Sequence, residues 1–279
     1  MRNEYEKQEF LQHLKEFASA LGYFISKDDE WTIRGFIDVF KNIYSISTDT
    51  KVVSKIIELH LFPHFVSFAD KYGYRLELAS CQNWYPDLTF VSTFDESIKF
   101  AVDLKTSYRL PNNPDYCNGF TLGSHGDYFV NRDSSKNIQH PYNEYSGHFC
   151  LGIIYTRAET DKDSETQIYS IDALETIPAV IKNFTFFAEE KWKIASDKAG
   201  SGNTANIGSI NKIEDILSGN GVFSKAGEEY FDNYWTNYGK IMTSDKNGAS
   251  KPIRSFIDYL AFRGLSEELN NPKARKRRQ

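Results

Sequence analysis

The sequence has few of the residues that stabilise small secreted or zinc-containing proteins. Three cysteines, Cys81, Cys117 and Cys150, are spread over 279 residues, which is too few and too scattered for a disulfide framework or a zinc site. We therefore expect a reducing compartment, the cytoplasm. Long apolar runs are missing too, because the longest, Phe149 to Tyr155, is far shorter than the roughly 20 residues of a membrane-spanning helix. The polar start, Met1 to Gln8, predicts no signal peptide, and no membrane partner is expected.

An overall positive charge is also lacking. With 33 Lys and Arg against 38 Asp and Glu, the formal net charge is −5, which argues against indiscriminate nucleic-acid binding and leaves room for a local basic groove. The stretch from Lys273 to Arg278 holds five cations and no anion. It is either a solubilising tail or an arm that contacts phosphates. In contrast, 21 Phe, 17 Tyr and 4 Trp allow a large core.

Three charged residues accompany two apolar segments. Asp87 precedes the first segment, and Asp103 and Lys105 lie within the second, residues 99–105. Residues two apart on a strand point to the same face, so the side chains of Asp103 and Lys105 are expected side by side. The polar residues 93–97 predict a hairpin turn that folds the two segments against each other. The three charged groups are therefore predicted to converge.

Two carboxylates and one ammonium at one place suit metal-dependent hydrolysis of phosphodiesters. Carboxylates on a rigid sheet repel each other unless a cation lies between them, and oxygen ligands favour Mg²⁺. A lysine beside the ion can orient a water molecule or lower its pKa, while the metal stabilises charge on a phosphoryl oxygen. The alternative is a surface ion pair at a sheet edge, which the motif Asp-x-Lys alone would favour.

The spacing of apolar residues predicts a mixed α/β fold. Helices are predicted over residues 5–22, from an N-cap within Ser47-Thr48-Asp49 to Gly73, and over 214–217, 228–238 and 253–262. Strands are predicted at 31–33, 74–78, 88–91, 99–109, 150–155 and 166–171, with one or two more in 184–194. The strand at 150–155 is expected in the centre of a mixed sheet. We expect Pro63 to interrupt the second helix, residues 111–114 to break a strand and residues 120–136 to form a surface segment.

Glu58 lies among the apolar positions of the second helix. It is either part of an exposed helix face or a third carboxylate that points at the metal site. His60 and His64 are four residues apart on the same helix, but no Glu follows His60, so a zinc-protease helix is not expected.

Polar residues on both sides of the charged trio are suited to DNA contacts. Gln82 and Asn83 precede it, and their amides would stand next to the scissile phosphate, although a polar loop that caps itself explains them equally well. Thr106 and Ser107 follow it and offer hydroxyl groups to backbone phosphates.

A glycine-rich segment, residues 199–209, lacks the glycine spacing of dinucleotide turns and the Gly-Lys-Ser/Thr of phosphate loops. Its composition predicts either a flexible linker or a loop that approaches base edges in the major groove. In the second interpretation an Asn amide pairs with adenine and a Thr methyl group packs on the thymine methyl. The candidate DNA-binding residues are Gly200, Ser201, Gly202, Asn203, Thr204 and Ala205.

Several motifs resemble, in order, those of the EcoRV family of type II restriction endonucleases, in the PD-(D/E)xK nuclease superfamily. They are Tyr85-Pro86-Asp87, Ala101-Val102-Asp103-Leu104-Lys105-Thr106, Tyr155-Thr156-Arg157 and the glycine-rich segment from Gly200 to Ile210. The first two are generic to metal-dependent nucleases, whereas the last is specific. The likeness covers about Ser47 to Tyr238. It implies a restriction-endonuclease-like core, with a mixed central sheet flanked by helices.

The resemblance implies a homodimer that binds double-stranded DNA and cuts both strands with Mg²⁺ at a short palindrome. By this likeness Asp87, Asp103 and Glu58 are metal ligands, and Lys105 handles the attacking water. Residues 200–205 match a major-groove recognition loop, and Gln82 and Asn83 match a minor-groove loop. The expected target is similar to GATATC, cut to blunt ends. A host DNA methyltransferase is expected to protect the same site without stable binding to the enzyme.

The family resemblance also suggests how the single endonuclease chain, 1–279, is divided. Residues 1–50 are expected to form an amino-terminal, dimerising part, 51–160 the catalytic core, 161–262 the DNA-recognition part and 263–279 a basic tail. Departures from the family pattern occur at Cys81, Ala205 and Thr236, which replace Gln, Thr and a basic residue. Two alternatives stay open: a sequence-specific DNA-binding protein without cleavage, and a structure-specific repair nuclease.

Overall fold

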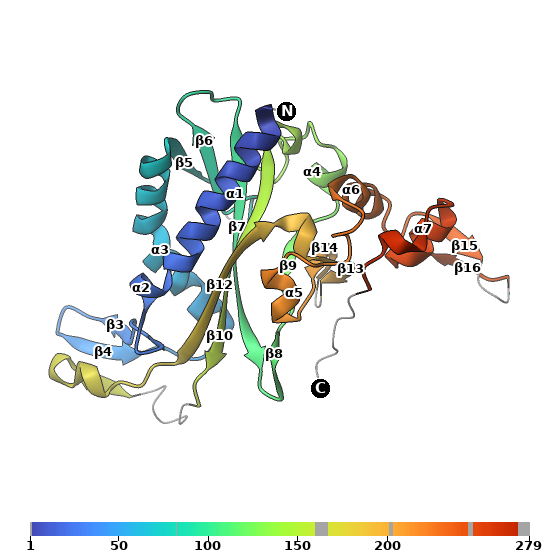
Figure 1. The fold of residues 1–279 in the computed structure, drawn as a ribbon. Helices are drawn as coiled ribbons and strands as arrows, with labels where there is room; N and C mark the ends of the chain where they lie inside the picture. Colours follow the sequence, from blue (N-terminus) through green and yellow to red (C-terminus); the bar gives the residue numbers. More distant parts are fainter. Residues whose placement is uncertain (1, 82, 160–166, 201–202, 245–247, 273–279) are drawn as a thin grey trace.

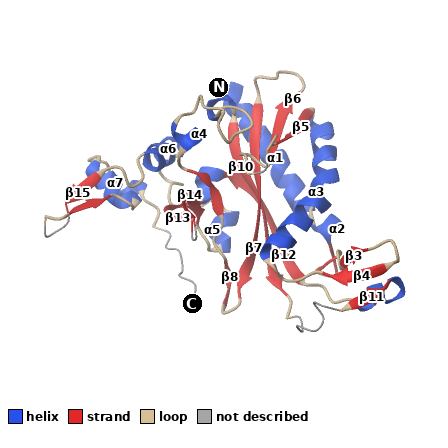
Figure 2. Ribbon diagram, turned by 180° about the vertical axis from the view of Figure 1, so that it is seen from behind, coloured by secondary structure: helices blue, strands red, loops and turns tan. Residues whose placement is uncertain are grey.

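A central mixed β-sheet organises the chain (Figures 1 and 2). The computed structural model describes residues 2–81, 83–159, 167–200, 203–244 and 248–272. The sheet has eight strands in the order β1-β2-β12-β10-β7-β6-β5, with β8 paired to β7. These strands are β1 Ser26–Lys27, β2 Glu30–Trp31, β5 Tyr74–Leu78, β6 Leu88–Ser92, β7 Lys99–Leu110, β8 Asn113–Cys117, β10 Gly147–Arg157 and β12 Ile181–Glu190. Strand β10 runs parallel to β7 and antiparallel to β12, which confirms the predicted central strand of a mixed sheet.

Helices lie on both sides of this sheet and at the carboxyl-terminal end. The α-helices are α1 Arg2–Ala20, α2 Gly22–Ile25, α3 Thr50–Tyr72, α4 Asp127–Val130, α5 Ile213–Leu217, α6 Glu228–Thr236 and α7 Phe256–Phe262. Short 3-10 turns are η1 Tyr142–Glu144, η3 Ile171–Thr176, η4 Lys191–Ile194 and η5 Glu267–Leu269. Helices α1 and α3 cover one face of the sheet, and α5 and α6 lie on the other side (Figure 1).

Helix α3 begins and ends where its sequence predicts. The carboxylate of Asp49 accepts hydrogen bonds from two backbone N–H groups of the first turn, and Gly73 closes the helix with a left-handed φ of 74°. The predicted interruption at Pro63 is wrong, because the helix continues through it. Leu61 and Phe65 on either side are buried in the core, and this packing compensates for the one backbone hydrogen bond that the proline removes.

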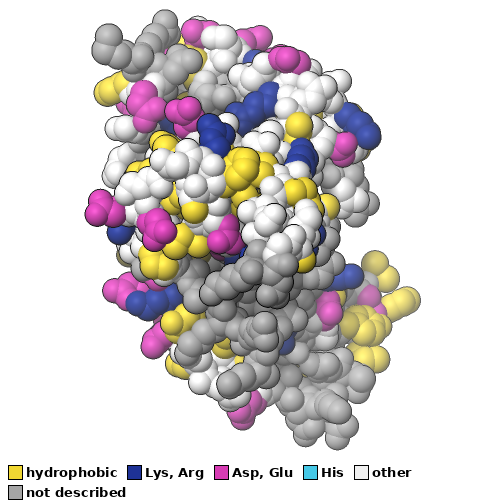
Figure 3. All heavy atoms as spheres, turned by 90° about the vertical axis from the view of Figure 1, so that its right-hand side faces the viewer, with side chains coloured by type: hydrophobic (Ala, Val, Ile, Leu, Met, Phe, Trp, Pro, Cys, Tyr) yellow, Lys and Arg dark blue, Asp and Glu magenta, His cyan; other side chains and the backbone are white. Residues whose placement is uncertain are grey.

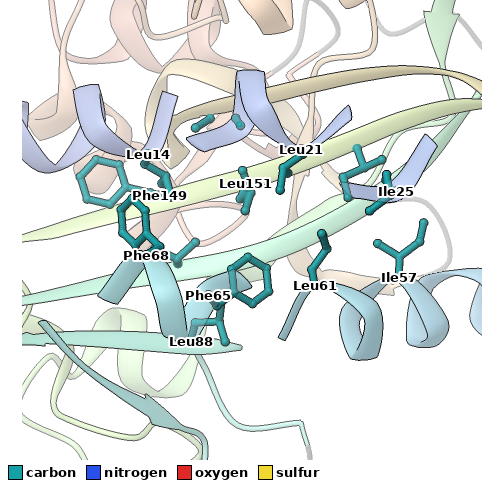
Figure 4. Close-up of a cluster of buried hydrophobic side chains, with 14 of the residues drawn as sticks. Leu14, Leu21, Ile25, Ile57, Leu61, Phe65, Phe68, Leu88, Phe149 and Leu151 are labelled. Atoms are coloured by element: carbon teal, nitrogen blue, oxygen red, sulfur yellow. The ribbon is translucent and has the colours of Figure 1, made fainter. Parts of the chain in front are cut away.

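The core beneath α1 and α3 is apolar and rich in phenylalanine. Figure 4 shows Leu14 of α1 and Leu21, which follows α1, facing side chains of α3 and of the sheet, among them Phe65 and Leu151. The ring of Phe10 stacks on that of Phe100 with centroids 4.2 Å apart. Helix α3 is long and apolar enough to cross a membrane by length and composition alone, but many of its apolar residues, such as Val53, Ile57 and Leu61, belong to this core.

The alternation of side chains along β7 decides where the charged trio lies. Phe100 and Val102 point into the core under α1 and α3, whereas Ala101 belongs to the hydrophobic cluster on the opposite face. Since side chains alternate, Asp103 and Lys105 emerge on the same face as Ala101. The site therefore lies away from α1 and toward the carboxyl-terminal half of the chain.

A second, three-stranded sheet stands on that face, with the strand order β13-β14-β9. Its strands are β13 Ala195–Gly200, β14 Asn203–Ser209 and β9 Thr121–Ser124. The prediction that residues 120–136 are only a surface segment is wrong, because they contain β9 and α4, and Leu122 and Phe129 are buried. Their burial depends on strands that follow about 80 residues later, which local composition does not reveal.

Two small sheets lie at the periphery. One has the order β11-β4-β3, with β3 Gly35–Ile37, β4 Asn42–Ser45 and β11 Ile168–Ser170, and the other pairs β15 Met242–Ser244 with β16 Ser250–Pro252. Figure 3 views the end of the molecule that carries β15, β16 and α7. Among the side chains drawn in colour there, acidic, basic and apolar groups are interspersed, and neither charge dominates this face.

The remaining secondary-structure predictions hold with shifted bounds. The strand expected at 31–33 is β2, the one at 166–171 is β11, with Thr166 outside the described residues, and the segment 184–194 holds β12 followed by η4. Strand β7 ends at Leu110 as expected, and the chain turns back as β8. The expected helices at 214–217, 228–238 and 253–262 are α5, α6 and α7. The basic residues 273–279 lie outside the described residues.

Candidate active site

The hairpin β6–β7 brings Asp87, Asp103 and Lys105 together. The two strands are antiparallel, with Leu88 opposite Val102, so Asp87 lies beside Asp103 at the end of the ladder. The Lys105 Nζ is 3.0 Å from Asp103 Oδ2 and 3.7 Å from Asp87 Oδ2. The backbone N–H of Leu104 donates to Asp87 Oδ2 over 2.8 Å, which fixes that carboxylate against β7. The expected convergence of the three charged groups is therefore present.

Burial makes the close approach of the two carboxylates energetically unfavourable. The Asp103 side chain is only 7% exposed, that of Lys105 21% and that of Asp87 45%. Burial raises the pKa of Asp87, the positive charge of Lys105 opposes that shift, and the negative charge of Asp103 adds to it. Two neighbouring carboxylates with only one ammonium between them leave an excess of negative charge. A cation bound at the site would relieve it.

The carboxylates around Lys105 favour its charged form. Burial works against its ammonium form, but the carboxylates of Asp103 and Asp87 outweigh burial, and the pKa of Lys105 lies above its ordinary value. Such a lysine donates hydrogen bonds and does not accept a proton at neutral pH. A lysine in this form can orient a water molecule and stabilise negative charge.

Two cavities meet at Asp87. One, of about 930 Å³, is lined by residues of α3 and by the end of β7, including Glu58 and Thr106. The other, of about 610 Å³, contains Asp103 and Lys105 together with residues of β9 and β14. Asp87 lines both cavities. A polymeric substrate that passes across Asp87 would thus contact α3 on one side and the three-stranded sheet on the other.

The donor set fits Mg²⁺. Within the part of the chain that the structure describes, no group of three or more His, Cys, Asp and Glu residues is arranged to hold a metal ion. Mg²⁺ does not require one, because it keeps several water molecules and is usually held by one or two carboxylates together with substrate phosphates. Asp87 and Asp103 supply such a pair of carboxylates next to a cavity that has room for a phosphate.

Comparison with known proteins identifies the family. The model of the family described as restriction endonuclease EcoRV matches residues 27–264. The type II restriction enzyme EcoRV of Escherichia coli is 37% identical over 234 residues, which are 83% of this chain and 93% of that enzyme. The chain belongs to the EcoRV family. It is a type II restriction endonuclease, a site-specific deoxyribonuclease whose substrate is double-stranded DNA, and it has the mixed α/β fold expected from the motifs.

In this restriction endonuclease the glycine-rich segment is part of a β-hairpin, so the linker interpretation is wrong. Gly200 ends β13, and Asn203 begins β14 and pairs with it. Ser201 and Gly202 lie outside the described residues. Strand β14 also pairs with β9, with Asn206 opposite Ser124. Because β9 lines the cavity of Asp103 and Lys105, this hairpin is tied directly to the active site.

Glu58 of α3 lines the larger cavity, which Asp87 also lines and Asp103 does not. Its carboxylate is 2.6 Å from the ammonium of Lys55, and its side chain is 45% exposed. Its negative charge contributes to the raised pKa of Asp87, after burial and the charges of Lys105 and Asp103, so the two carboxylates repel each other. The structure thus places Glu58 near the pair formed by Asp87 and Asp103, but not in contact with it.

The other candidate DNA contacts are distributed around the same cavities. Asn83, with a left-handed φ of 69°, is exposed and lines both of them, whereas Gln82 lies outside the described residues. Thr106 lines the larger cavity. Ser107 is buried, and its hydroxyl donates to the backbone carbonyl of Asn118. A phosphate contact by Ser107 would have to compete with that bond.

Sequence reasoning missed the aromatic layer behind the site. Tyr85 and Tyr142 are buried there, the Tyr85 hydroxyl lies 2.8 Å from His148 Nδ1, and the ring of His148 stacks on Tyr142 at 3.8 Å. Burial lowers the pKa of His148 well below its ordinary value, with nearby cations adding to the effect, so the imidazole is neutral. Lys191 is buried in the same layer. The only local signal was Tyr85 in the Tyr-Pro-Asp motif.

Proposed function

We propose that this nuclease cuts both strands of DNA at a short palindrome similar to GATATC, uses Mg²⁺ and leaves blunt ends. The observation that carries the proposal is the contact of Lys105 Nζ with Asp103, at 3.0 Å, and with Asp87, at 3.7 Å. These groups lie in a cavity that a strand of the glycine-rich hairpin helps to line. The similarity of that hairpin segment to the family's recognition loop supports the target.

In the proposed mechanism Asp87 and Asp103 hold the metal ion, and Glu58 assists from α3. The bound Mg²⁺ would supply charge stabilisation at a phosphoryl oxygen and lower the pKa of a water molecule. The backbone bond from Leu104 keeps the Asp87 carboxylate oriented, so little reorganisation is needed when the substrate binds. The Asp103 side chain is almost fully buried, so the surrounding residues hold its carboxylate in place.

Lys105 orients the attacking water and stabilises the negative charge that develops on the phosphate. The neighbouring carboxylates favour its protonated form, and the proton of the water goes to another acceptor, such as solvent or a substrate phosphate oxygen. A preformed ammonium aimed at the reacting group is the arrangement that lowers a barrier most effectively in a water-poor site.

We propose that Gly200 to Ala205 read base edges in the major groove, while Asn83, Gln82, Thr106 and Ser107 contact the minor groove and the backbone. A glycine-rich turn allows the backbone to approach the bases, and an Asn amide can form two hydrogen bonds with adenine. The pairing of β14 with β9 supports a direct link between base recognition and the catalytic cavity.

A homodimer would give each strand of a palindrome its own active site, because a twofold axis relates both the two chains and the two half-sites. Exposed apolar side chains on the peripheral sheet β11-β4-β3 and its turn support this proposal. Phe36 is 50% exposed, Ile37 59% and Phe40 81%. Such a patch on a soluble enzyme calls for a partner, and we propose a second copy of this chain.

Two further proposals follow from the reaction itself. An enzyme that cuts a short DNA sequence endangers the genome of its own host, so a DNA methyltransferase should modify the same sequence. Both enzymes would act where that DNA is found, in the cytoplasm of a bacterial host.

The decisive experiment incubates purified protein with plasmid DNA and Mg²⁺, followed by sequencing of the ends. Discrete fragments with blunt ends at a single palindrome are expected. In parallel, Asp103→Ala should lose cleavage and still bind DNA, since its carboxylate serves the metal rather than the bases. Glu96→Ala is a suitable control, because Glu96 lies in the turn of the same hairpin and pairs with Arg75 at 2.8 Å.

Three results would contradict parts of this proposal. Shifted but uncut DNA would indicate a binding protein, and cuts that follow DNA structure rather than sequence would indicate a repair nuclease. Full Mg²⁺-dependent cleavage by Asp103→Ala would remove that carboxylate from the mechanism.

A further inference from the structure

Lys191 is a buried lysine directly behind the active site. It is the first residue of η4, immediately after β12, and only 3% of it is exposed. Its Nζ lies 4.9 Å from the centroid of the Tyr85 ring, 5.5 Å from Phe129 and 5.6 Å from Tyr142. Among the residues that the structure describes, no atom accepts a hydrogen bond from this Nζ. The ammonium thus lies among aromatic rings, and no carboxylate of the described residues accepts a hydrogen bond from it.

A neighbouring lysine shows what an ordinary buried ammonium does in this fold. Lys7 is also buried, but its Nζ contacts Glu190 and, at 2.6 Å, Glu228. Burial of a charge is strongly unfavourable without such compensation, and cation–π contacts recover only part of the loss. Lys191 is therefore retained at a position where the ligand-free protein gains little from its charge. Such a group indicates a role in the ligand-bound state.

The ammonium of Lys191 lies just beneath the wall of the catalytic cavity. A Cβ atom on Gly123 would come within 3.3 Å of Lys191 Nζ, and Gly123 lines the cavity together with Asp103 and Lys105. Burial lowers the pKa of Lys191 to about 8, Asp103 and Asp232 oppose that shift, and Lys105 and Arg132 add to it. The amine thus remains mostly protonated at neutral pH, and its charge interacts with the charges of the site.

We propose that Lys191 is a positioning residue of the nuclease site: its buried ammonium, held behind Gly123 and Tyr85, offsets the negative charge of the two aspartates and of the phosphate bound between them. This inference rests on the proposed metal-dependent function. The positive charge weakens divalent-metal binding in the DNA-free protein, because like charges repel. It stabilises the complex in which a phosphate and the attacking water add further negative charge.

The test uses Lys191→Met, which keeps the length and apolar stem of the side chain and removes the charge. In the DNA-free protein, Mn²⁺ binding followed by electron paramagnetic resonance should become about three- to tenfold tighter, because a repelling charge is gone. With DNA and saturating Mg²⁺, single-turnover cleavage should fall roughly tenfold. Opposite directions for metal affinity and rate are the signature of the charge, because a merely structural defect would weaken both.

Two further variants separate charge from packing. Lys191→Gln keeps a hydrogen-bonding group without the charge and should shift both measurements in the same directions as Lys191→Met. Lys193→Met removes a lysine of the same segment whose ammonium pairs with Glu190 at 2.6 Å, and it should leave Mn²⁺ affinity unchanged. Thermal unfolding should show Lys191→Met at least as stable as the wild type, since an unpaired buried charge has been replaced by an apolar group.

Unchanged or weaker Mn²⁺ binding in Lys191→Met and Lys191→Gln, with an active wild type, overturns this inference and leaves the proposed function intact. A wild type that neither binds Mn²⁺ nor cuts DNA overturns the proposed function, and the role of Lys191 falls with it.

Discussion

The hairpins β6–β7 and β13–β14 are both antiparallel pairs beside the same cavity, but they differ in burial and in the regularity of their pairing. All five residues of β6 are buried, and β7 lies between β6 and β10 inside the eight-stranded sheet. The hairpin β13–β14 belongs to a sheet of three strands. The pairing of β14 with β13 and its pairing with β9 both contain register shifts. The first hairpin holds charged side chains within a packed sheet, and the second carries the glycine-rich segment that we propose contacts the DNA.

In the proposed function this difference separates catalysis from the selection of a DNA sequence. A metal site must keep two carboxylates at fixed positions despite their mutual repulsion, and only a deeply packed hairpin supplies the rigidity. A base-reading hairpin must approach the DNA closely, which favours glycine and small polar residues over packed side chains. Changes in β6–β7 should therefore remove catalysis or the fold, whereas changes in β13–β14 should alter the choice of sequence.

The largest effect is expected for Lys105→Ala. Loss of an ammonium that lies 3.0 Å from Asp103 removes the group that we propose orients the water and stabilises the developing charge, so single-turnover cleavage should fall by about 10³-fold or more. DNA binding in a filter or gel assay should change little. Lys99→Ala on the same strand, whose ammonium is 3.3 Å from Glu144, is the matched control and should cut normally. Wild-type cleavage rates in Lys105→Ala would show that the Lys105 side chain is not needed for cleavage.

The next effect concerns the framework of the same hairpin. Phe100→Ala should lower the free energy of unfolding by about 3–5 kcal/mol, because Phe100 is fully buried and stacks on Phe10. Phe94→Ala offers the same chemical change in the turn of the hairpin, where the side chain is 90% exposed, and should stay within about 0.5 kcal/mol. Chemical denaturation measures both. Equal losses would mean that the interior of the hairpin is not the rigid part.

The contrast between the hairpins also explains which features were predictable. The convergence of Asp87, Asp103 and Lys105 followed from the two-residue period of strands and one polar turn, both of which are local. The strand β9 was missed, because the burial of Leu122 depends on pairing with β14, far along the chain. Lys191 was missed for the same reason, since its aromatic neighbours come from separate segments.

A moderate effect is expected in the glycine-rich hairpin. If Asn203 reads a base, Asn203→Ala should remove about 1–3 kcal/mol of discrimination at one base pair of the target. Cleavage of the correct site should fall roughly 10- to 100-fold. Sites altered at that position should then be cut at a rate closer to the rate at the correct site. The free energy of unfolding should not change. Asn112→Ala, in the exposed turn between β7 and β8, should cut with unaltered specificity. Unaltered specificity in Asn203→Ala would contradict a base-reading role for Asn203.

The smallest effect returns to β6–β7 and tests whether its charges oppose folding. Because burial and Asp103 raise the pKa of Asp87, the folded protein favours the neutral form of this carboxyl group, and its ionised form destabilises the fold. Asp87→Asn should therefore unfold at a higher denaturant concentration at pH 7 in the absence of metal. The carboxylate is 45% exposed, and solvent screening limits the gain to at most about 1 kcal/mol.

The direction in which pH and Mg²⁺ change this stability gain of Asp87→Asn also follows. A raised pKa means that the stability penalty of Asp87 appears as pH rises from the ordinary aspartate pKa through the folded value, so the advantage of Asp87→Asn should shrink toward acid pH. Mg²⁺ should stabilise the wild type more than the variant, because only the wild type keeps both carboxylates for the ion. A variant that is less stable than the wild type at pH 7 without metal would show that the bond from the Leu104 N–H to Asp87 outweighs the repulsion between the two carboxylates.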